Sequence, residues 1–260
     1  MKCCICGTVR NCEPFLTKIF QNMELLGSLF EDYIIILYYD ESHDNTLNIM
    51  KQYQEQNSKF TFYVNKGPLL PYRTFRLALG RNFCMDTIRS NYSDYEYFIV
   101  MDCDDRCAKE ININIVKLYL SQNNWDGLSF MHPDGYYDCW ALSIYPYIAN
   151  CYIYNTGLNA NTDKVNRLAR TISPNKLIKC SSAFNGFAIY RTNKFINCKY
   201  NGSFTLKNIP RELLIMNMKA VRGFKKDKPI EDCEHRAFHF EAIKKNGARI
   251  RISPFKLFKN

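Results

Sequence analysis

The first half of the chain alternates between short apolar segments and longer segments in which apolar residues recur at helical spacing. The apolar segments are rich in β-branched and aromatic residues, as strands are, and they span residues 3–9, 33–39, 59–64, 95–101 and 126–131. Helices are predicted over residues 13–30, 72–88 and 110–120, and another begins at Asp44. This alternation predicts an α/β fold with a mainly parallel sheet flanked by helices.

The second half of the chain is less regular. After about residue 131, Pro and Gly residues punctuate a stretch that is rich in Tyr. Helices are predicted over residues 163–170, 210–221 and 234–245, and strands over 184–190 and 248–252. No low-complexity linker divides the sequence. We therefore predict one domain with two halves, a regular α/β half (1–131) and an irregular half (132–260).

Composition and charge narrow the classes of protein that fit. Hydrophobic residues make up 47% of the 260 residues and charged residues 23%, which excludes the profile of a disordered chain. The longest apolar run, residues 33–39, is far shorter than the roughly 18 residues of a membrane span. With no signal-like N-terminal segment, we expect a soluble cytoplasmic protein with reduced thiols. The net charge of +10 favours phosphate-bearing partners.

The strongest local signal is an apolar strand that leads directly into three carboxylates, Phe98-Ile-Val-Met-Asp-Cys-Asp-Asp105. In extended backbone, Asp102 and Asp104 project to the same side, so both can reach one ion. Carboxylate oxygens together with a diphosphate suit a hard divalent cation, and ligands of open α/β sheets gather at the carboxyl ends of strands. The alternative is that Asp104 or Asp105 caps the next helix.

Two weaker signals precede the acidic strand. The segment 40–46 places Asp40 directly after a predicted strand and Asp44 at the start of a helix. Asp40 is positioned to accept hydrogen bonds from a base or ribose, although helix capping is an equally good interpretation of this segment. Arg81 lies in the helix that leads to the acidic strand and offers a fork of donors for phosphate or carboxylate.

In this order, the three motifs DESHDNT (40–46), GRN (80–82) and MDCDD (101–105) resemble those of the GT-A glycosyltransferases. Those enzymes have an aspartate at a strand end with Ser-x-Asp-x-Thr, an Ala-Arg-Asn segment and a DxD motif. Later segments are similar to the fungal capsule-associated α-mannosyltransferases and their relatives in large DNA viruses. These segments are YYDCWAL (136–142), FNGFAIY (184–190) and CEHRAFH (233–239).

The resemblance implies a Rossmann-type, GT-A-like fold and a metal-dependent glycosyltransferase. Such an enzyme moves a sugar from a nucleotide-diphosphate donor, here UDP- or GDP-linked, to a glycan or glycoconjugate acceptor. By resemblance, Asp40 contacts the nucleoside, Arg81 holds the nucleotide, Asp102 contacts the ribose or the metal, and Asp104 binds the metal, Mn²⁺ or Mg²⁺. Residues 1–131 would then bind the nucleotide sugar and residues 132–260 the acceptor, in the cytoplasm of the host if the protein is viral.

On the acceptor side, the resemblance implies Glu234 as the general base, with Asp232 as the second candidate. Asp138 and Trp140 lie in the irregular half, where a Tyr-rich surface suits stacking against sugar rings or, equally, core packing. Asn185 is expected in a turn or in the acceptor site.

The role of His235 is less clear from the residues. Some metal-dependent glycosyltransferases that the chain resembles use a late His as an extra metal ligand. His235 or His239, one helical turn apart on the same face, could serve here. The alternative interpretation is that a His beside a carboxylate in a helix is a packing or surface residue.

The residues also leave three alternative functions open. The net charge and the basic segment 244–251 are typical of a nucleic-acid-binding module, although the motifs disfavour nucleic acid as a partner. A nucleotidyltransferase would also be metal-dependent and α/β, whereas the lack of a Walker-type loop disfavours a nucleoside triphosphatase. The same basic end carries Phe255 and Phe258, which would suit docking to a membrane surface.

Overall fold

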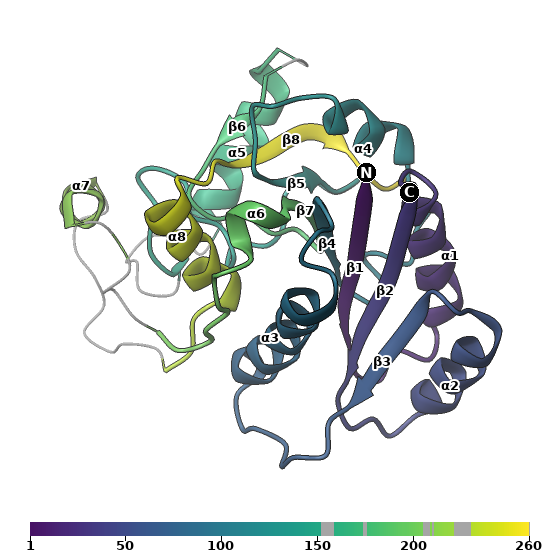
Figure 1. The fold of residues 1–260 in the computed structure, drawn as a ribbon. Coiled ribbons are helices and arrows are strands. Elements are labelled where there is room, and N and C mark those ends of the chain that lie inside the picture. The colour runs from purple at the N-terminus through teal and green to yellow at the C-terminus, as the bar shows by residue number, and fades with distance from the viewer. Residues whose placement is uncertain (152–158, 174–175, 205–208, 210, 221–229, 260) are drawn as a thin grey trace.

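One mixed β-sheet of eight strands runs through the protein (Figure 1). The computed structural model describes residues 1–151, 159–173, 176–204, 209, 211–220 and 230–259. In chain order the strands are β1 (Lys2–Val9), β2 (Asp32–Tyr39), β3 (Phe60–Val64), β4 (Tyr97–Met101), β5 (Gly127–Met131), β6 (Ile178–Lys179), β7 (Phe187–Arg191) and β8 (Ile250–Lys256). Across the sheet they are ordered β3-β2-β1-β4-β7-β5-β8-β6.

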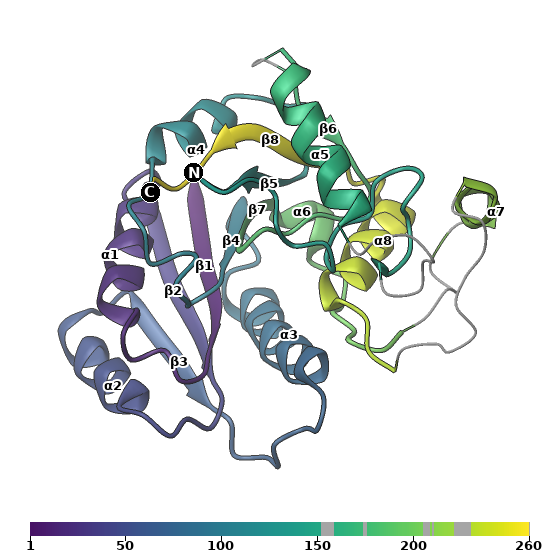
Figure 2. The same ribbon diagram turned by 180° about the vertical axis from the view of Figure 1, so that it is seen from behind.

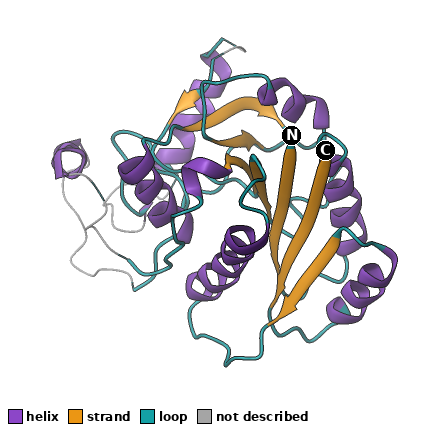
Figure 3. Cartoon of the chain, in the orientation of Figure 1, coloured by secondary structure: helices purple, strands orange, loops and turns teal. Residues whose placement is uncertain are grey.

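Helices flank this sheet, as the alternation of the sequence predicts (Figure 3). They are α1 (Leu16–Gly27), α2 (Thr46–Gln56), α3 (Arg73–Asn91), α4 (Ile113–Leu120), α5 (Ala160–Thr171), α6 (Thr192–Phe195), α7 (Arg211–Ala220) and α8 (Glu234–Asn246). Gly247 follows α8 with φ of 61°, the left-handed conformation that glycine adopts at a helix end without strain. The expected helix over 210–221 matches α7, except that its two end residues lie outside the described residues.

The first half of the sheet is parallel, and the second half mixes parallel and antiparallel pairs. Strands β1, β2, β3 and β4 pair in parallel, which confirms the prediction for the regular half. Strand β7 then enters antiparallel between β4 and β5. Strand β8 pairs in parallel with β5, so four of the seven pairings in the described sheet are parallel, and the expectation of a mainly parallel sheet is confirmed. The antiparallel entry of β7 depends on how the irregular half returns across the sheet. That return is not visible in local residue patterns.

The two faces of the sheet carry separate hydrophobic layers. Successive residues of β1 point to opposite faces, so Cys4 and Cys6 pack with residues of α3 and α8. Cys3 and Ile5 pack instead with residues of α1 and α4. The view from behind shows the helices on both sides of the sheet (Figure 2). Burial of β1 on both faces explains why its sequence is apolar without alternation.

No helix in the described part of the chain is both long enough and apolar enough to cross a lipid bilayer.

Candidate functional site

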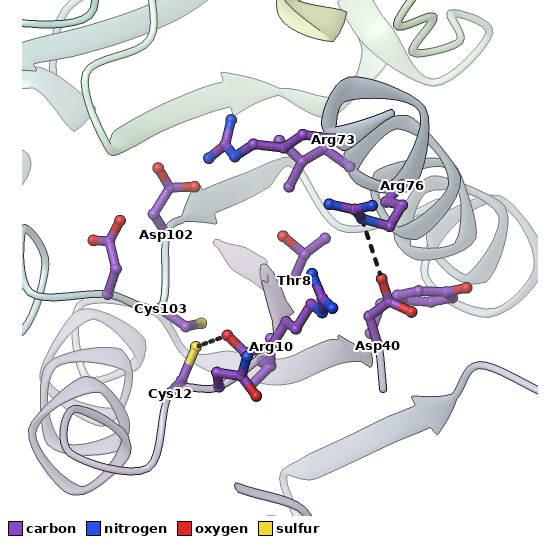
Figure 4. Close-up of a pocket in the computed structure, with 13 residues that line it drawn as sticks. Thr8, Arg10, Cys12, Asp40, Arg73, Arg76, Asp102 and Cys103 are labelled. Atoms are coloured by element: carbon purple, nitrogen blue, oxygen red, sulfur yellow. Dashed lines mark hydrogen bonds and ion pairs between the residues drawn. The ribbon is translucent and has the colours of Figure 1, made fainter. Parts of the chain in front are cut away.

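A pocket of about 300 Å³ opens at the carboxyl ends of β1, β2 and β4, beside the start of α3 (Figure 4). This is the edge of the sheet at which ligands of open α/β folds bind. The residues that line the pocket are Thr8, Val9, Arg10, Asn11, Cys12, Tyr38, Asp40, Arg73, Arg76, Leu77, Asp102, Cys103 and Asp104. Three of the predicted site residues, Asp40, Asp102 and Asp104, are therefore brought to one pocket.

Asp40 is held at one side of this pocket. It follows β2, and its backbone N–H donates to the carbonyl of Val9, which ties it to the end of β1. Its Oδ1 accepts a hydrogen bond from Nδ2 of Asn65 at 3.1 Å, and its Oδ2 lies 3.8 Å from Nε of Arg76. The carboxylate is almost buried, so its orientation is fixed before any ligand arrives.

Asp102 and Asp104 occupy the other side, directly after β4. Backbone contacts fix both residues: the Asp102 N–H donates to the carbonyl of Gly186, and Oδ1 of Asp104 accepts from the N–H of Arg106. The chain passes close to β1 here, because a Cβ on Gly7 would lie 2.9 Å from Sγ of Cys103. A glycine at position 7 thus allows the acidic segment to approach β1.

The charge of Asp102 disfavours ionisation of Asp104. Burial and this nearby charge together raise the pKa of Asp104 to about 6. Burial also raises the pKa of Asp102, against the opposing charges of Arg81 and Arg73. Such a pair is stabilised in its ionised form by any cation that binds between or beside the two groups.

Three arginines that sequence reasoning missed line the same pocket: Arg10, Arg73 and Arg76. In the close-up, Asp102 and Asp40 stand on opposite sides of the pocket, and the arginines lie between them (Figure 4). One signal was available in the sequence. Arg73 and Arg76 both lie in the first turn of α3, where the helix dipole disfavours positive charge, so their presence there is unusual.

Arg81 lies beneath the pocket and does not line it. Its guanidinium is 5% exposed and bridges two carboxylates, with Nη2 3.1 Å from Oδ1 of Asp102 and Nε 3.0 Å from Oε1 of Glu234. Its guanidinium also stacks over the ring of Phe184. Burial lowers the pKa of Arg81, but the charges of Glu234 and Asp102 outweigh this and raise it. In this position Arg81 holds Asp102 rather than an open ligand.

The two predicted general bases are both buried in ion pairs. The Glu234 side chain is 3% exposed and faces Arg81. Asp232 is engaged by Nε of Arg236 at 3.1 Å, by the N–H of Cys233 and by Nδ2 of Asn150. Burial raises the pKa of Asp232, and Arg236 opposes this rise. Both carboxylates thus face protein groups within the described part of the chain, and their predicted catalytic role is not tested by this geometry.

The structure does not bring His235 to the two aspartates. Its ring stacks on Phe184, with 3.9 Å between ring centroids, and it is almost fully buried in α8. Burial lowers the pKa of His235 well below its usual range, and the charge of Arg81 lowers it further. Among the described residues, no three His, Cys, Asp or Glu side chains meet in a way that could hold a metal. His235 is thus a packed residue in this structure, and its role as a metal ligand stays a prediction.

The residues predicted for the acceptor side form a loop that Asn185 anchors. Oδ1 of Asn185 accepts hydrogen bonds from the N–H groups of Tyr137 and Asp138, and its Nδ2 donates to the carbonyls of Phe130 and Gly135. Asn185 thus has the geometry of a buried positioning residue. Trp140 is half-buried and packs against the hydrophobic layer that contains α3 and α8.

Comparison with known proteins identifies the family of this chain. The model of glycosyl transferase family 2 matches residues 4–198, which is most of the chain. The chain belongs to glycosyl transferase family 2. This family agrees with the resemblance drawn from the motifs, and the predicted α/β fold of GT-A type is confirmed by the sheet together with this assignment.

Two solved structures show a distant likeness to this family 2 chain. A crystal structure of S. aureus TarS 1–349 is 15% identical, with a TM-score of 0.45, and the match covers 99% of this chain. The mannosyltransferase PcManGT from Pyrobaculum calidifontis, in complex with GDP-Man and Mn²⁺, is 11% identical, with a TM-score of 0.45 and 96% of this chain covered. This chain spans 59% of the TarS chain and 56% of the PcManGT chain. A search of curated protein sequences finds no match.

A divalent ion, which the family resemblance implies, fits the residues at the acidic side of the pocket. Asp102 and Asp104 supply hard oxygen ligands, and burial raises the pKa of both carboxyl groups, so a bound cation would favour their ionised forms. Two carboxylates leave room in the coordination sphere of Mg²⁺ or Mn²⁺ for diphosphate oxygens and water. His235 is not needed for this arrangement.

Two cations of the basic segment near the C-terminus form ion pairs with carboxylates of the protein itself. Arg249 pairs with Asp126 at 2.8 Å, and Lys245 pairs with Glu241. The following residues form β8, which lies between β5 and β6 in the sheet. Much of the charge that suggested nucleic-acid binding is therefore used within this family 2 fold.

Proposed function

We propose that the protein is a metal-dependent glycosyltransferase that moves a sugar from a UDP- or GDP-linked donor to a hydroxyl of a glycan or glycoconjugate. The observation that carries the proposal is the pocket at the carboxyl edge of the sheet. It holds Asp40 at one side, Asp102 and Asp104 at the other, and three arginines between them. This order of charges matches a nucleoside, a diphosphate and a metal laid across one pocket.

The nucleoside would lie against Asp40 and Tyr38. Asp40 is fixed by Asn65 and Arg76, so its carboxylate can accept hydrogen bonds from the hydroxyls of a ribose without reorganisation. Tyr38 also lines the pocket, and its ring packs against those of Tyr63 and Phe83, which also stack on each other. A rigid aromatic surface of this kind suits stacking against a base.

The diphosphate would lie between the arginines and the acidic side. Arg73 and Arg76 present planar forks of donors that match phosphate oxygens, and Arg10 approaches from the end of β1. A divalent ion held by Asp102 and Asp104 would neutralise the charge that develops on the leaving diphosphate. Arg81 holds Asp102 in place from below, through its ion pair at 3.1 Å.

We also propose a more specific relationship within the glycosyltransferases. The motifs at 136–142, 184–190 and 233–239 support a place near the fungal capsule-associated α-mannosyltransferases and their relatives in large DNA viruses. Activity towards a mannose donor would be the expected consequence.

A thermal-shift screen tests the proposed function. Purified protein is mixed with UDP, GDP, CMP, ATP and their common sugar conjugates, with and without Mn²⁺. A ligand that binds only the folded protein raises the melting temperature, by about 5 to 10 °C at roughly 100 times the dissociation constant. We expect such a shift with one nucleoside diphosphate, and we expect it to depend on Mn²⁺.

Two results would count against the proposal. A folded protein that shifts with none of the nucleotides does not have the donor site. A protein that instead binds nucleic acid, with an affinity that falls steeply as salt rises, belongs to the alternative class.

A further inference from the structure

We propose that Asp138 is the residue that receives the proton of the acceptor hydroxyl. This inference rests on the proposed function, because it assigns a role within the same site. It differs from the expectation drawn from the motifs, in which Glu234 or Asp232 is the base and Asp138 only binds the acceptor.

The carboxylate of Asp138 is held rigidly by one of its oxygens. Oδ1 accepts hydrogen bonds from the N–H groups of Trp140 at 3.1 Å and Ala141 at 3.0 Å. No hydrogen bond from the described residues reaches its other oxygen, Oδ2, and the residue is only partly buried. One oxygen thus fixes the orientation while the other stays available to a ligand.

The fold places this carboxylate beside the acidic side of the pocket. The N–H of Asp138 donates to Oδ1 of Asn185, and the next residue, Gly186, accepts a hydrogen bond from the N–H of Asp102 at 2.8 Å. The loop of Asp138 and the strand end of Asp102 are therefore joined through two consecutive residues. The charges of Asp102, Glu234 and Arg73 are all felt at Asp138, which agrees with this placement.

The other two carboxylates are badly placed for proton transfer to an incoming ligand. Glu234 is 3% exposed and pairs with Arg81, and Asp232 is 6% exposed and pairs with Arg236. A base must come within hydrogen-bond reach of the proton that it removes, so a carboxylate enclosed by its own ion pair has to be uncovered first. Asp138 needs no such step.

The proton affinity of Asp138 also suits the role. Burial, together with the charges of Asp102 and Glu234, raises the pKa of Asp138 to about 7, although the hydrogen bond from Ala141 opposes the rise. A general base works best when its pKa lies near the working pH.

The step balances with the groups that the proposed function supplies. The acceptor oxygen forms a bond to C1 of the sugar, and the bond between C1 and the phosphate oxygen breaks. Its electron pair leaves with the nucleoside diphosphate. The proton of the acceptor hydroxyl passes to Oδ2 of Asp138, which later releases it to water.

The experiment compares Asp138→Asn with Asp134→Asn in the full chain, using the donor found by thermal shift. Asn at position 138 keeps the Oδ1 atom that accepts the two N–H groups, so the loop should remain in place. Asp134 is an exposed carboxylate of the same loop, 61% exposed, and serves as the matched control. The measurement is the release of nucleoside diphosphate from the donor, with water or a simple sugar as acceptor.

We expect Asp138→Asn to lower the turnover number by about 100-fold or more, within the usual contribution of a general base. Its melting temperature and the Mn²⁺-dependent shift with the nucleoside diphosphate should match those of the unmodified protein, and Asp134→Asn should keep full turnover. If Asp138→Asn turns over the donor normally while Glu234→Gln does not, the assignment is wrong and Glu234 is the base. If the unmodified protein neither binds nor turns over any donor, the proposed function fails instead.

Discussion

At the scale of single residues, charge arrangement decides what the pocket can bind. Burial raises the pKa of Asp102 and Asp104, the charge of Asp102 adds to the rise at Asp104, and three arginines line the same pocket. A phosphate group together with a divalent cation satisfies both sets of charges at once.

Replacing Asp104 with Asn should remove metal-dependent turnover without unfolding the protein. The amide keeps an oxygen that can accept the N–H of Arg106, but it lacks the charge that a divalent ion requires. We expect nucleoside diphosphate release to fall by about 100-fold or more, since a metal contributes several kcal/mol at a developing charge. The exposed neighbour Asp105→Asn is the control, and an active Asp104→Asn would contradict the metal assignment.

His239 should make the stability of the protein depend on pH. Both ring nitrogens lie in buried hydrogen bonds, to Oγ of Ser182 at 2.9 Å and to the hydroxyl of Tyr190 at 3.0 Å. Burial, together with the charges of Arg236 and Arg81, lowers the pKa of His239 to about 3. In the unfolded chain the pKa of a His is about 6.5.

The unfolded chain therefore binds this proton more readily at every pH between about 3 and 6.5, and stability falls as the pH drops through that range. From pH 7 to pH 5 the loss from His239 should be about 2 kcal/mol. Urea unfolding at both pH values measures it. In His239→Gln the difference between the two pH values should shrink by about that amount, and an unchanged difference would contradict the prediction.

At the scale of elements, α3 connects the pocket to the buried ion pairs beneath it. Its first turn supplies Arg73 and Arg76 to the pocket, and its middle supplies Arg81 to Asp102 and Glu234. The helix must lie close to β1 and β2 for all three to reach. Gly80 permits this, because a Cβ there would lie 2.7 Å from Cδ1 of Tyr38 and 2.8 Å from Cγ2 of Thr8.

Replacing Gly80 with Ala should therefore destabilise the protein, although Ala favours a helix by about 1 kcal/mol. Forcing a methyl group into a packed contact typically costs 1–3 kcal/mol, so we expect a net loss of about 1 kcal/mol and weaker nucleotide binding. Gly67→Ala is the control, since its Cβ would meet only Oδ1 of Asn65, at 3.3 Å on the surface. Urea unfolding gives the comparison. A stabilised Gly80→Ala protein would show that α3 does not need the close approach.

At the scale of the whole molecule, the two halves of the sequence share one sheet. Strand β7 lies between β4 and β5, and β5 pairs with β7 on one side and β8 on the other. Both neighbours of β5 therefore come from residues beyond 131. The acidic strand end after β4 also depends on the second half, because Gly186 accepts the N–H of Asp102.

A fragment of residues 1–131 should not fold by itself. Without β7 and β8, β4 has an open edge and β5 has no partner, so buried backbone groups would lose their hydrogen bonds. We expect a flat urea unfolding curve or aggregation for the fragment, against one cooperative transition for the full chain. A fragment that unfolds cooperatively would mean that the regular half is a domain of its own.

The sequence by itself determined the parallel half of the sheet and the acidic end of its central strand. Periodicity and apolar runs are local properties, so β1 to β4 and α1 to α4 follow from residues close together in the chain. The short motifs likewise predicted that Asp40, Asp102 and Asp104 share a site, since parallel strands end at one edge.

Only the tertiary structure decided the rest. It placed the antiparallel β7 inside the sheet, turned Arg81 inward between two carboxylates, and buried His235 against Phe184. Each outcome depends on contacts between residues far apart in the chain, and on whether a polar side chain faces solvent or a buried partner. Local sequence patterns show neither the long-range contacts nor the burial of a side chain, because both depend on how the complete chain packs.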